Sequence, residues 1–155
     1  MKQFPLYFEG QDVNRVEDKR NLQKTREVML RIMSQLVPSL YQVDFYIELS
    51  DNQPLNKFLS NIRTKSGNEC LKSMESWADI RILDKVVKVI NTLYIETSLK
   101  DLQGISNITN RTRFKKQIID PMIFLGIVEM TVPDKPNSRY QLYRLSKIGK
   151  ELFTL

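Results

Sequence analysis

The stretch NRTRFKKQIIDPM, residues 110–122, decides how the rest of this chain is interpreted. It opens with asparagine, a residue that often caps helix N-termini. Four basic side chains follow within two turns, and the stretch then becomes apolar. An apolar residue recurs every three or four positions, which predicts a buried helical stripe made of Phe114, Ile118, Met122 and Leu125. We therefore expect a helix over 110–125, called the basic helix below, with Pro121 kinking it.

Two short β-type segments follow the basic helix. Residues 127–132 and 140–145 are rich in β-branched or aromatic side chains and alternate with period two. The connection between them holds two prolines, an aspartate, an asparagine and a serine, which predicts a hairpin turn of more than two residues. Lys135 and Arg139 lie at its tip or shoulder. A helix with a basic start, followed by a hairpin with a basic tip, is the order of elements in a winged helix.

A shorter helix is expected before the basic helix. Ser98 precedes Asp101 by three residues, a variant of the capping box. We expect the helix to be short because Gly104 interrupts it, and the residues predicted to point inward are Leu99, Leu102 and Ile105. A short helix, a turn containing glycine and a second helix follow the helix-turn-helix order.

The first 96 residues are predicted to be helical. Apolar periodicity indicates one helix over about 14–37 and a longer one from Trp77 to about Glu96, with Trp77 and Tyr94 in the core. Residues 38–53 fit either a half-buried strand or a helix, and the flanking helices favour a helix. The resulting fold class is mainly α (α+β): four or five N-terminal helices over 1–96, serving dimerisation or sensing, and a winged helix-turn-helix DNA-binding domain over 97–155.

Composition excludes several kinds of enzyme. The chain of 155 residues has no histidine, which removes the commonest general base and metal ligand. The single cysteine, Cys70, excludes an internal disulfide and a cysteine-based zinc site. No glycine-rich phosphate loop is present. We expect no catalytic residues, no metal and no cofactor.

The net charge of +6 is concentrated in the C-terminal third. Residues 98–155 hold 10 Lys and Arg against 5 Asp and Glu, whereas residues 1–97 hold 14 against 13. A basic surface of this kind attracts polyanions, and nucleic acid is the usual one. Charge alone fits equally well a solvated surface with a high isoelectric point.

The candidate DNA-binding residues come from two segments. Recognition helices reach base edges and phosphates with their N-terminal ends, and wing residues reach the adjacent backbone. The candidates are Asn110, Arg111, Thr112, Arg113, Lys115, Lys116, Gln117, Lys135, Asn137 and Arg139. This interpretation requires that the cations of 111–116 and 135–139 share one open surface.

Four blocks in this part of the chain form a recognisable pattern: RTRF at 111–114, DP at 120–121, GI at 126–127 and PDKPNSRYQLYRL at 133–145. They resemble the C-terminal winged-helix domain of Fic-family proteins and of RecG-like helicase-related regulators, over about residues 98–153. The resemblance implies an accessory module that binds DNA or regulates its neighbour. It does not imply AMP transfer, since the HPFxxGNGR-type motif of Fic proteins needs a histidine, nor unwinding, since helicase motifs are absent.

We therefore expect a non-enzymatic, cytoplasmic, sequence-specific DNA-binding protein, a transcriptional regulator that binds double-stranded DNA as a homodimer. The alternative is a protein-interaction module whose basic surface docks an acidic partner or a separately encoded enzyme, because a fold does not fix a function. No window approaches the ~20 apolar residues of a membrane span, and the N-terminus lacks the apolar core of a signal peptide.

Overall fold

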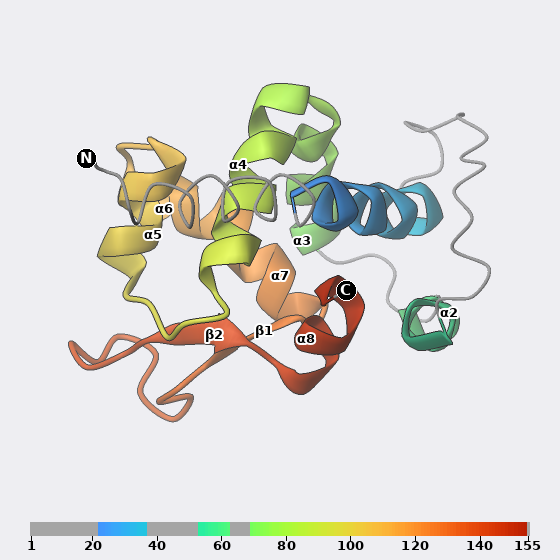
Figure 1. Cartoon of the computed structure of the whole chain (residues 1–155). Helices are drawn as coiled ribbons and strands as arrows, with labels where there is room; N and C mark the ends of the chain where they lie inside the picture. The colour runs from blue at the N-terminus through green and yellow to red at the C-terminus, as the bar shows by residue number, and fades with distance from the viewer. Residues whose placement is uncertain (1–21, 37–52, 63–68, 155) are drawn as a thin grey trace, which may run out of the picture.

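The computed structural model describes residues 22–36, 53–62 and 69–154 (Figure 1). Helices dominate, and one two-stranded antiparallel sheet lies near the C-terminus, so the predicted fold class is confirmed. The predictions for residues 1–21 and 37–52 lie outside the described residues. The elements in chain order are a helix over 22–36, α2 (Gln53–Ile62), α3 (Glu69–Met74), η1 (Glu75–Ala78), α4 (Ile80–Thr92), α5 (Leu99–Ser106), α6 (Arg111–Phe114), η2 (Lys115–Ile119), α7 (Asp120–Phe124), β1 (Val128–Met130), β2 (Tyr143–Leu145) and α8 (Lys147–Phe153).

The elements from α4 to β2 follow the order of a winged helix. After α4, Thr97 forms an antiparallel bridge with Tyr143, donating to and accepting from its backbone. Helices α5 and α6 come next, and β1 then pairs with β2, with Val128 opposite Leu145. Thr97 therefore extends the two-stranded sheet by one bridged residue beside β2. Helix α4 is the first helix of this winged-helix order.

The basic helix runs without a break through α6, η2 and α7, from Arg111 to Phe124. Asn110 caps it, since its Oδ1 accepts from the backbone N–H of Arg113 at 2.9 Å. Pro121 is accommodated by a π-helical turn at η2, a usual cause of local distortion in helices. Gly126 follows the end of the helix with φ of 82°, a conformation that glycine adopts without a Cβ clash. The predicted helix over 110–125 is confirmed.

Two predictions about the preceding helix are wrong. Gly104 does not interrupt α5, which continues to Ser106 and ends at Asn107 in the left-handed conformation. The Ser98 cap is confirmed, because its Oγ accepts from the Asp101 N–H at 3.2 Å. Leu99 and Leu102 are buried as expected, but Ile105 is 37% exposed. Gly104 is tolerated because a single glycine costs a helix only ~1 kcal/mol relative to alanine.

The long helix predicted from Trp77 to Glu96 is shorter than expected. Trp77 belongs to the 3₁₀ turn η1, and α4 begins at Ile80, where the Asp79 carboxylate accepts from the Arg81 N–H. This cap stops the two segments from merging into one helix. Trp77 is fully buried, as predicted, whereas Tyr94 lies beyond the end of α4 and is 38% exposed.

Helix 22–36 packs against α4 through polar as well as apolar contacts. Thr25 is fully buried and donates its hydroxyl hydrogen to Asn91 Oδ1 at 3.0 Å. Arg26 of helix 22–36 forms a 2.6 Å ion pair with Asp84 of α4. The apolar side chains between these two helices belong to one continuous core that extends to α8. No helix in the described ranges combines the length and the apolar character that crossing a membrane requires.

The hairpin strands are shorter than the predicted ranges 127–132 and 140–145, with only three residues each. Gln141 supplies the reason. Its side-chain amide accepts from the Val132 N–H at 2.8 Å and donates to the Val132 carbonyl at 2.6 Å. Val132 thus pairs with a side chain instead of a neighbouring strand, and the chain leaves the sheet. Residues 131–142 form the connection, called the wing below.

Candidate nucleic-acid interface

The basic helix exposes most of its cationic side chains. Arg111, Thr112, Arg113 and Lys116 are exposed, whereas Phe114 and the two isoleucines that follow at 118 and 119 are fully buried. Among the described residues, the basic side chains of this helix take part in no ion pair. Elsewhere acids hold arginines: Arg26 pairs with Asp84, Arg81 with Asp79, and Arg144 with both Glu96 and Glu129.

The Asp120 carboxyl interacts electrostatically with two of these cations, Lys115 and Lys116. Its partial burial raises the pKa of the carboxyl above its usual value, and the charges of Lys115 and Lys116 oppose that shift. The charges of the two lysines therefore act on the Asp120 carboxyl, although neither lysine forms an ion pair with it. Lys115 is half-buried, and Lys116 is exposed.

Arg111 and Asp120 both influence the phenol of Tyr143 on β2. Burial raises the pKa of the Tyr143 phenol on β2, Asp120 raises it further, and the Arg111 charge lowers it. These influences require Arg111 and Asp120 to lie near the Tyr143 ring. The sheet thus lies near the basic helix.

The basic helix is also tied to η1 through Gln117. Pro121 has no N–H for the carbonyl four residues earlier, which is that of Gln117. The buried Trp77 indole N–H donates to this carbonyl at 2.8 Å. The Gln117 amide nitrogen donates in turn to Ser76 Oγ at 3.0 Å. Gln117, a candidate DNA-binding residue, is therefore committed to a contact within the protein.

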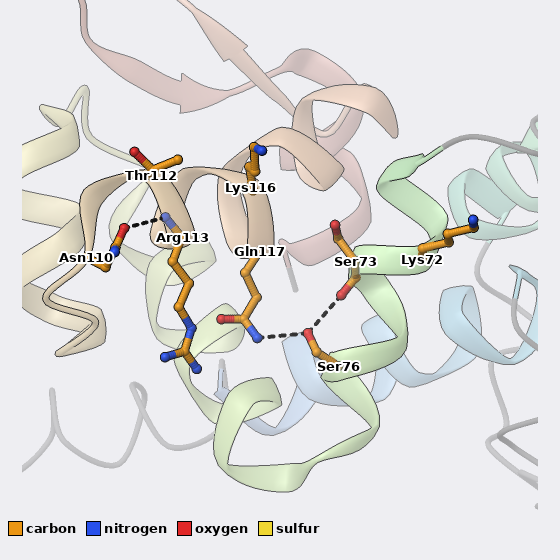
Figure 2. Close-up of a pocket in the computed structure, with 8 residues that line it drawn as sticks. All are labelled: Lys72, Ser73, Ser76, Asn110, Thr112, Arg113, Lys116 and Gln117. Atoms are coloured by element: carbon orange, nitrogen blue, oxygen red, sulfur yellow. Dashed lines mark hydrogen bonds between the residues drawn. The ribbon is translucent and has the colours of Figure 1, made fainter.

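An open groove of about 510 Å³ separates the basic helix from α3 and η1 (Figure 2). We call it the basic groove, because the described residues that line it include three cations and no acid. In Figure 2, Arg113 and Gln117 point toward Ser76, whereas Thr112 and Lys116 point to the other side of the helix. The lining residues are Lys72, Ser73, Ser76, Asn110, Thr112, Arg113, Lys116 and Gln117.

The wing presents its cations differently. Lys135 and Asn137 are exposed, as predicted for wing residues. The Arg139 guanidinium lies 4.9 Å from the centre of the Tyr140 ring and donates to the Tyr140 hydroxyl at 2.8 Å. Tyr140 itself is 70% exposed. These three candidates lie outside the basic groove, so a surface shared by wing and basic helix stays a prediction.

The match to known families covers the helix-turn-helix and the wing. Residues 84–146 match the family described as "Filamentation induced by cAMP protein Fic-like, C-terminal domain". The resemblance to Fic-family C-terminal domains is thereby confirmed for this segment, called the Fic-like region below. No curated protein and no solved structure matches the chain. The resemblance to RecG-like regulators stays a prediction.

The Fic-like region begins inside α4, so it contains the helix-turn-helix-like fold and excludes α3 and η1. All ten candidate residues predicted from the sequence fall within it. One wall of the basic groove therefore lies outside the Fic-like region. The division of the chain at residues 96 and 97 stays a prediction.

Four residues at this site escaped the sequence analysis: Lys72, Ser73, Ser76 and Gln141. The first three line the basic groove, and Gln141 is buried beneath the wing, where it also donates to the Lys135 carbonyl at 3.2 Å. Pro121 was a usable signal, because it leaves the carbonyl four residues earlier without its helical donor. The sequence contained no indication that Trp77 would supply that donor.

The described residues contain no group of three or more Asp, Glu, Cys or His that could hold a metal ion. The titratable groups with shifted pKa values near the basic helix are Asp120 on α7 and Tyr143 on β2, and burial raises the pKa of both. The site as described thus consists of cations, hydroxyls and amides. Such groups bind phosphate through charge and hydrogen bonds.

Proposed function

We propose that this chain is a cytoplasmic DNA-binding winged-helix protein that acts as a transcriptional regulator and not as an enzyme. The basic helix enters the major groove of double-stranded DNA, and the wing contacts the adjacent backbone. The helix-turn-helix-like fold of the Fic-like region supports this proposal, because that arrangement presents its second helix to the major groove.

The unpaired cations of the basic helix are the observation on which the proposal depends. Arg111, Arg113 and Lys116 are exposed, and no acid of the described residues lies within ion-pair distance of them. By contrast, the Arg144 guanidinium forms ion pairs with the carboxylates of Glu96 at 2.7 Å and Glu129 at 2.8 Å. Each protein cation that neutralises a DNA phosphate releases condensed counterions and adds affinity, so unpaired cations are suited to this partner.

The candidates differ in the hydrogen bonds that they already make within the protein. The Oδ1 atom of Asn110 is used by the helix cap, and the Gln117 amide is used by Ser76. Arg111, Arg113 and Lys116 have no such commitment. An arginine that reaches a guanine through two hydrogen bonds supplies ~1–3 kcal/mol of discrimination, so Arg111 and Arg113 are the proposed readers of base sequence.

The proposal includes a homodimer. Paired half-sites let two modest monomer affinities combine, which is common among helix-turn-helix regulators. The N-terminal helices, which include helix 22–36 packed on α4, would supply the dimer contact or the effector site. Analytical ultracentrifugation of the full chain, with and without a duplex, tests this part by itself.

The decisive experiment measures binding of the full chain to random-sequence duplex DNA by fluorescence anisotropy across a range of salt concentrations. The proposal predicts that log K falls linearly with log salt, because each phosphate contact releases condensed counterions. Absence of detectable binding at ~50 mM salt would contradict it, since non-specific binding is strongest under those conditions.

A second candidate function is docking of a protein partner, and one observation favours it. Tyr140 is a largely exposed aromatic residue stacked with Arg139 on the wing, and both residue types are enriched in protein interfaces. Recovery of an acidic partner that Tyr140→Ala abolishes, together with no duplex binding by the unmodified chain, would support this function.

A further inference from the structure

The basic groove has two walls of different origin. The basic helix, inside the Fic-like region, forms one wall, and α3 with η1 forms the other. Lys72 is exposed on the second wall next to Ser73, and the Ser76 hydroxyl on the same wall is bonded to Gln117 and to the Ser73 carbonyl (Figure 2). A site that joins the two walls is therefore a property of this chain's own N-terminal part combined with the helix-turn-helix.

Buried contacts fix the two walls against each other. Helix α3 packs on η2 and α7, and Met74 at its end is fully buried. The Trp77 indole donates to the Gln117 carbonyl at 2.8 Å, and the Gln117 amide donates to Ser76 at 3.0 Å. The groove is thus built into the packing of the protein, and its width does not depend on a surface loop.

The cations that line the groove are spread out. In Figure 2, the Arg113 guanidinium extends toward the Ser76 end, the Lys116 side chain extends to the opposite side of the basic helix, and Lys72 extends away along the second wall. A single small anion needs cations that converge on one point. A nucleic acid strand, with one charge every ~3.4 Å, needs cations distributed along its path. Arg113 and Lys72 extend in different directions from the two walls, and this separation favours the strand, whereas Lys116 lies on the other side of the basic helix.

The Ser73 hydroxyl on the second wall fits the same ligand. Phosphate oxygens commonly accept hydrogen bonds from serine and threonine as well as from lysine and arginine. Ser73 is half-exposed beside Lys72 on the second wall, whereas Thr112 points with Lys116 to the other side of the basic helix, and the Gln117 amide nitrogen is used by Ser76. No carboxylate of a described residue lines the groove and would repel a phosphodiester.

We propose that the basic groove holds the sugar-phosphate backbone of one DNA strand, and that Lys72 is a phosphate contact supplied from outside the winged helix. This inference rests on the proposed function, which it extends by adding a contact that the Fic-like region does not contain. The duplex would then be held on both sides of the basic helix, by the wing beside the sheet and by Lys72 beside η1.

The test compares the salt dependence of DNA binding for the full chain and three single variants. Lys72→Gln should lower the magnitude of the slope of log K against log salt by about 1, and weaken binding about equally for different sequences. Lys72→Arg keeps the charge and should restore the slope. Lys150→Gln changes another exposed lysine, on α8, that does not line the basic groove; it is the matched control and should leave the slope unchanged.

The outcomes separate this inference from the proposed function. A slope for Lys72→Gln equal to that of the unmodified chain, or lowered no more than that of Lys150→Gln, overturns the contact while DNA binding stands. If the unmodified chain does not bind duplex DNA, the proposed function and the contact fail together. Circular dichroism of each variant should match that of the unmodified chain, because both lysines are exposed.

Discussion

The basic helix and the wing both carry basic residues, but their cationic side chains differ in the partners that they have within the protein. Arg111, Arg113 and Lys116 extend from the helix with no acid partner among the described residues. On the wing, Arg139 stacks on Tyr140, and at the base of the wing Arg144 is held between two glutamates. The comparison teaches that a count of basic residues overstates the charge available for binding, because some of it is used in the fold.

The largest predicted effect separates the two regions directly. Replacing Arg111, Arg113 and Lys116 together by glutamine should lower the magnitude of the salt slope for random-sequence DNA by about 3, since in non-specific binding each of these cations contacts phosphate and contributes about 1. The double variant Lys135→Gln, Arg139→Gln should lower it by less than 2, because Arg139 is engaged with Tyr140. Anisotropy titrations at several salt concentrations measure both. Equal slope changes per charge removed would show that the two regions do not differ.

The next effect concerns how the basic helix is supported. Trp77→Phe keeps an aromatic ring but removes the N–H that reaches the Gln117 carbonyl. Leaving that buried carbonyl unpaired should cost ~1–3 kcal/mol of unfolding free energy, with the smaller ring adding a packing loss. Urea denaturation followed by circular dichroism measures it. A change below ~0.5 kcal/mol would mean that the carbonyl finds another donor.

A smaller and more local effect is predicted for the wing. Gln141→Ala removes the side-chain bonds to Val132 and to the Lys135 carbonyl. Loss of these bonds should cost ~1 kcal/mol, because Gln141 is buried but Val132 is half-exposed, so water can reach part of the backbone that loses its partner. Hydrogen exchange should become faster at the wing amides and stay unchanged in the basic helix. Faster exchange in both would show that the wing and the helix unfold as one unit.

The smallest effect is a pH dependence at Asp120. Burial raises its folded-state pKa, so the folded protein binds this proton more tightly than the unfolded chain does. The stability conferred by that proton is fully present below the unfolded pKa and is lost as pH rises through the raised folded value. Asp120→Asn should therefore stabilise the protein near pH ~7, with the gain disappearing toward pH ~3. Thermal melts at the two pH values measure it, and a destabilised variant near pH ~7 would contradict it.

Local sequence patterns were sufficient to predict the main elements of the C-terminal part. The Ser98 and Asn110 caps, the apolar stripe from Phe114 to Leu125 and the hairpin after Gly126 all occur where predicted. These features depend on residues within a few positions of one another. Helix capping and hydrophobic periodicity are interactions of this short range, so a single sequence contains them.

Only the tertiary structure decided what the side chains at the site do. Gln117, predicted as a DNA contact, donates its amide hydrogen to Ser76, 41 positions away, while Trp77 reaches the Gln117 carbonyl across 40 positions. The sequence by itself determined that a capped, basic helix precedes a hairpin. Packing determined which of its polar groups remain free and that Lys72 lies across the groove, because partners so far apart in the chain meet only when the core brings α3 and η1 against the basic helix.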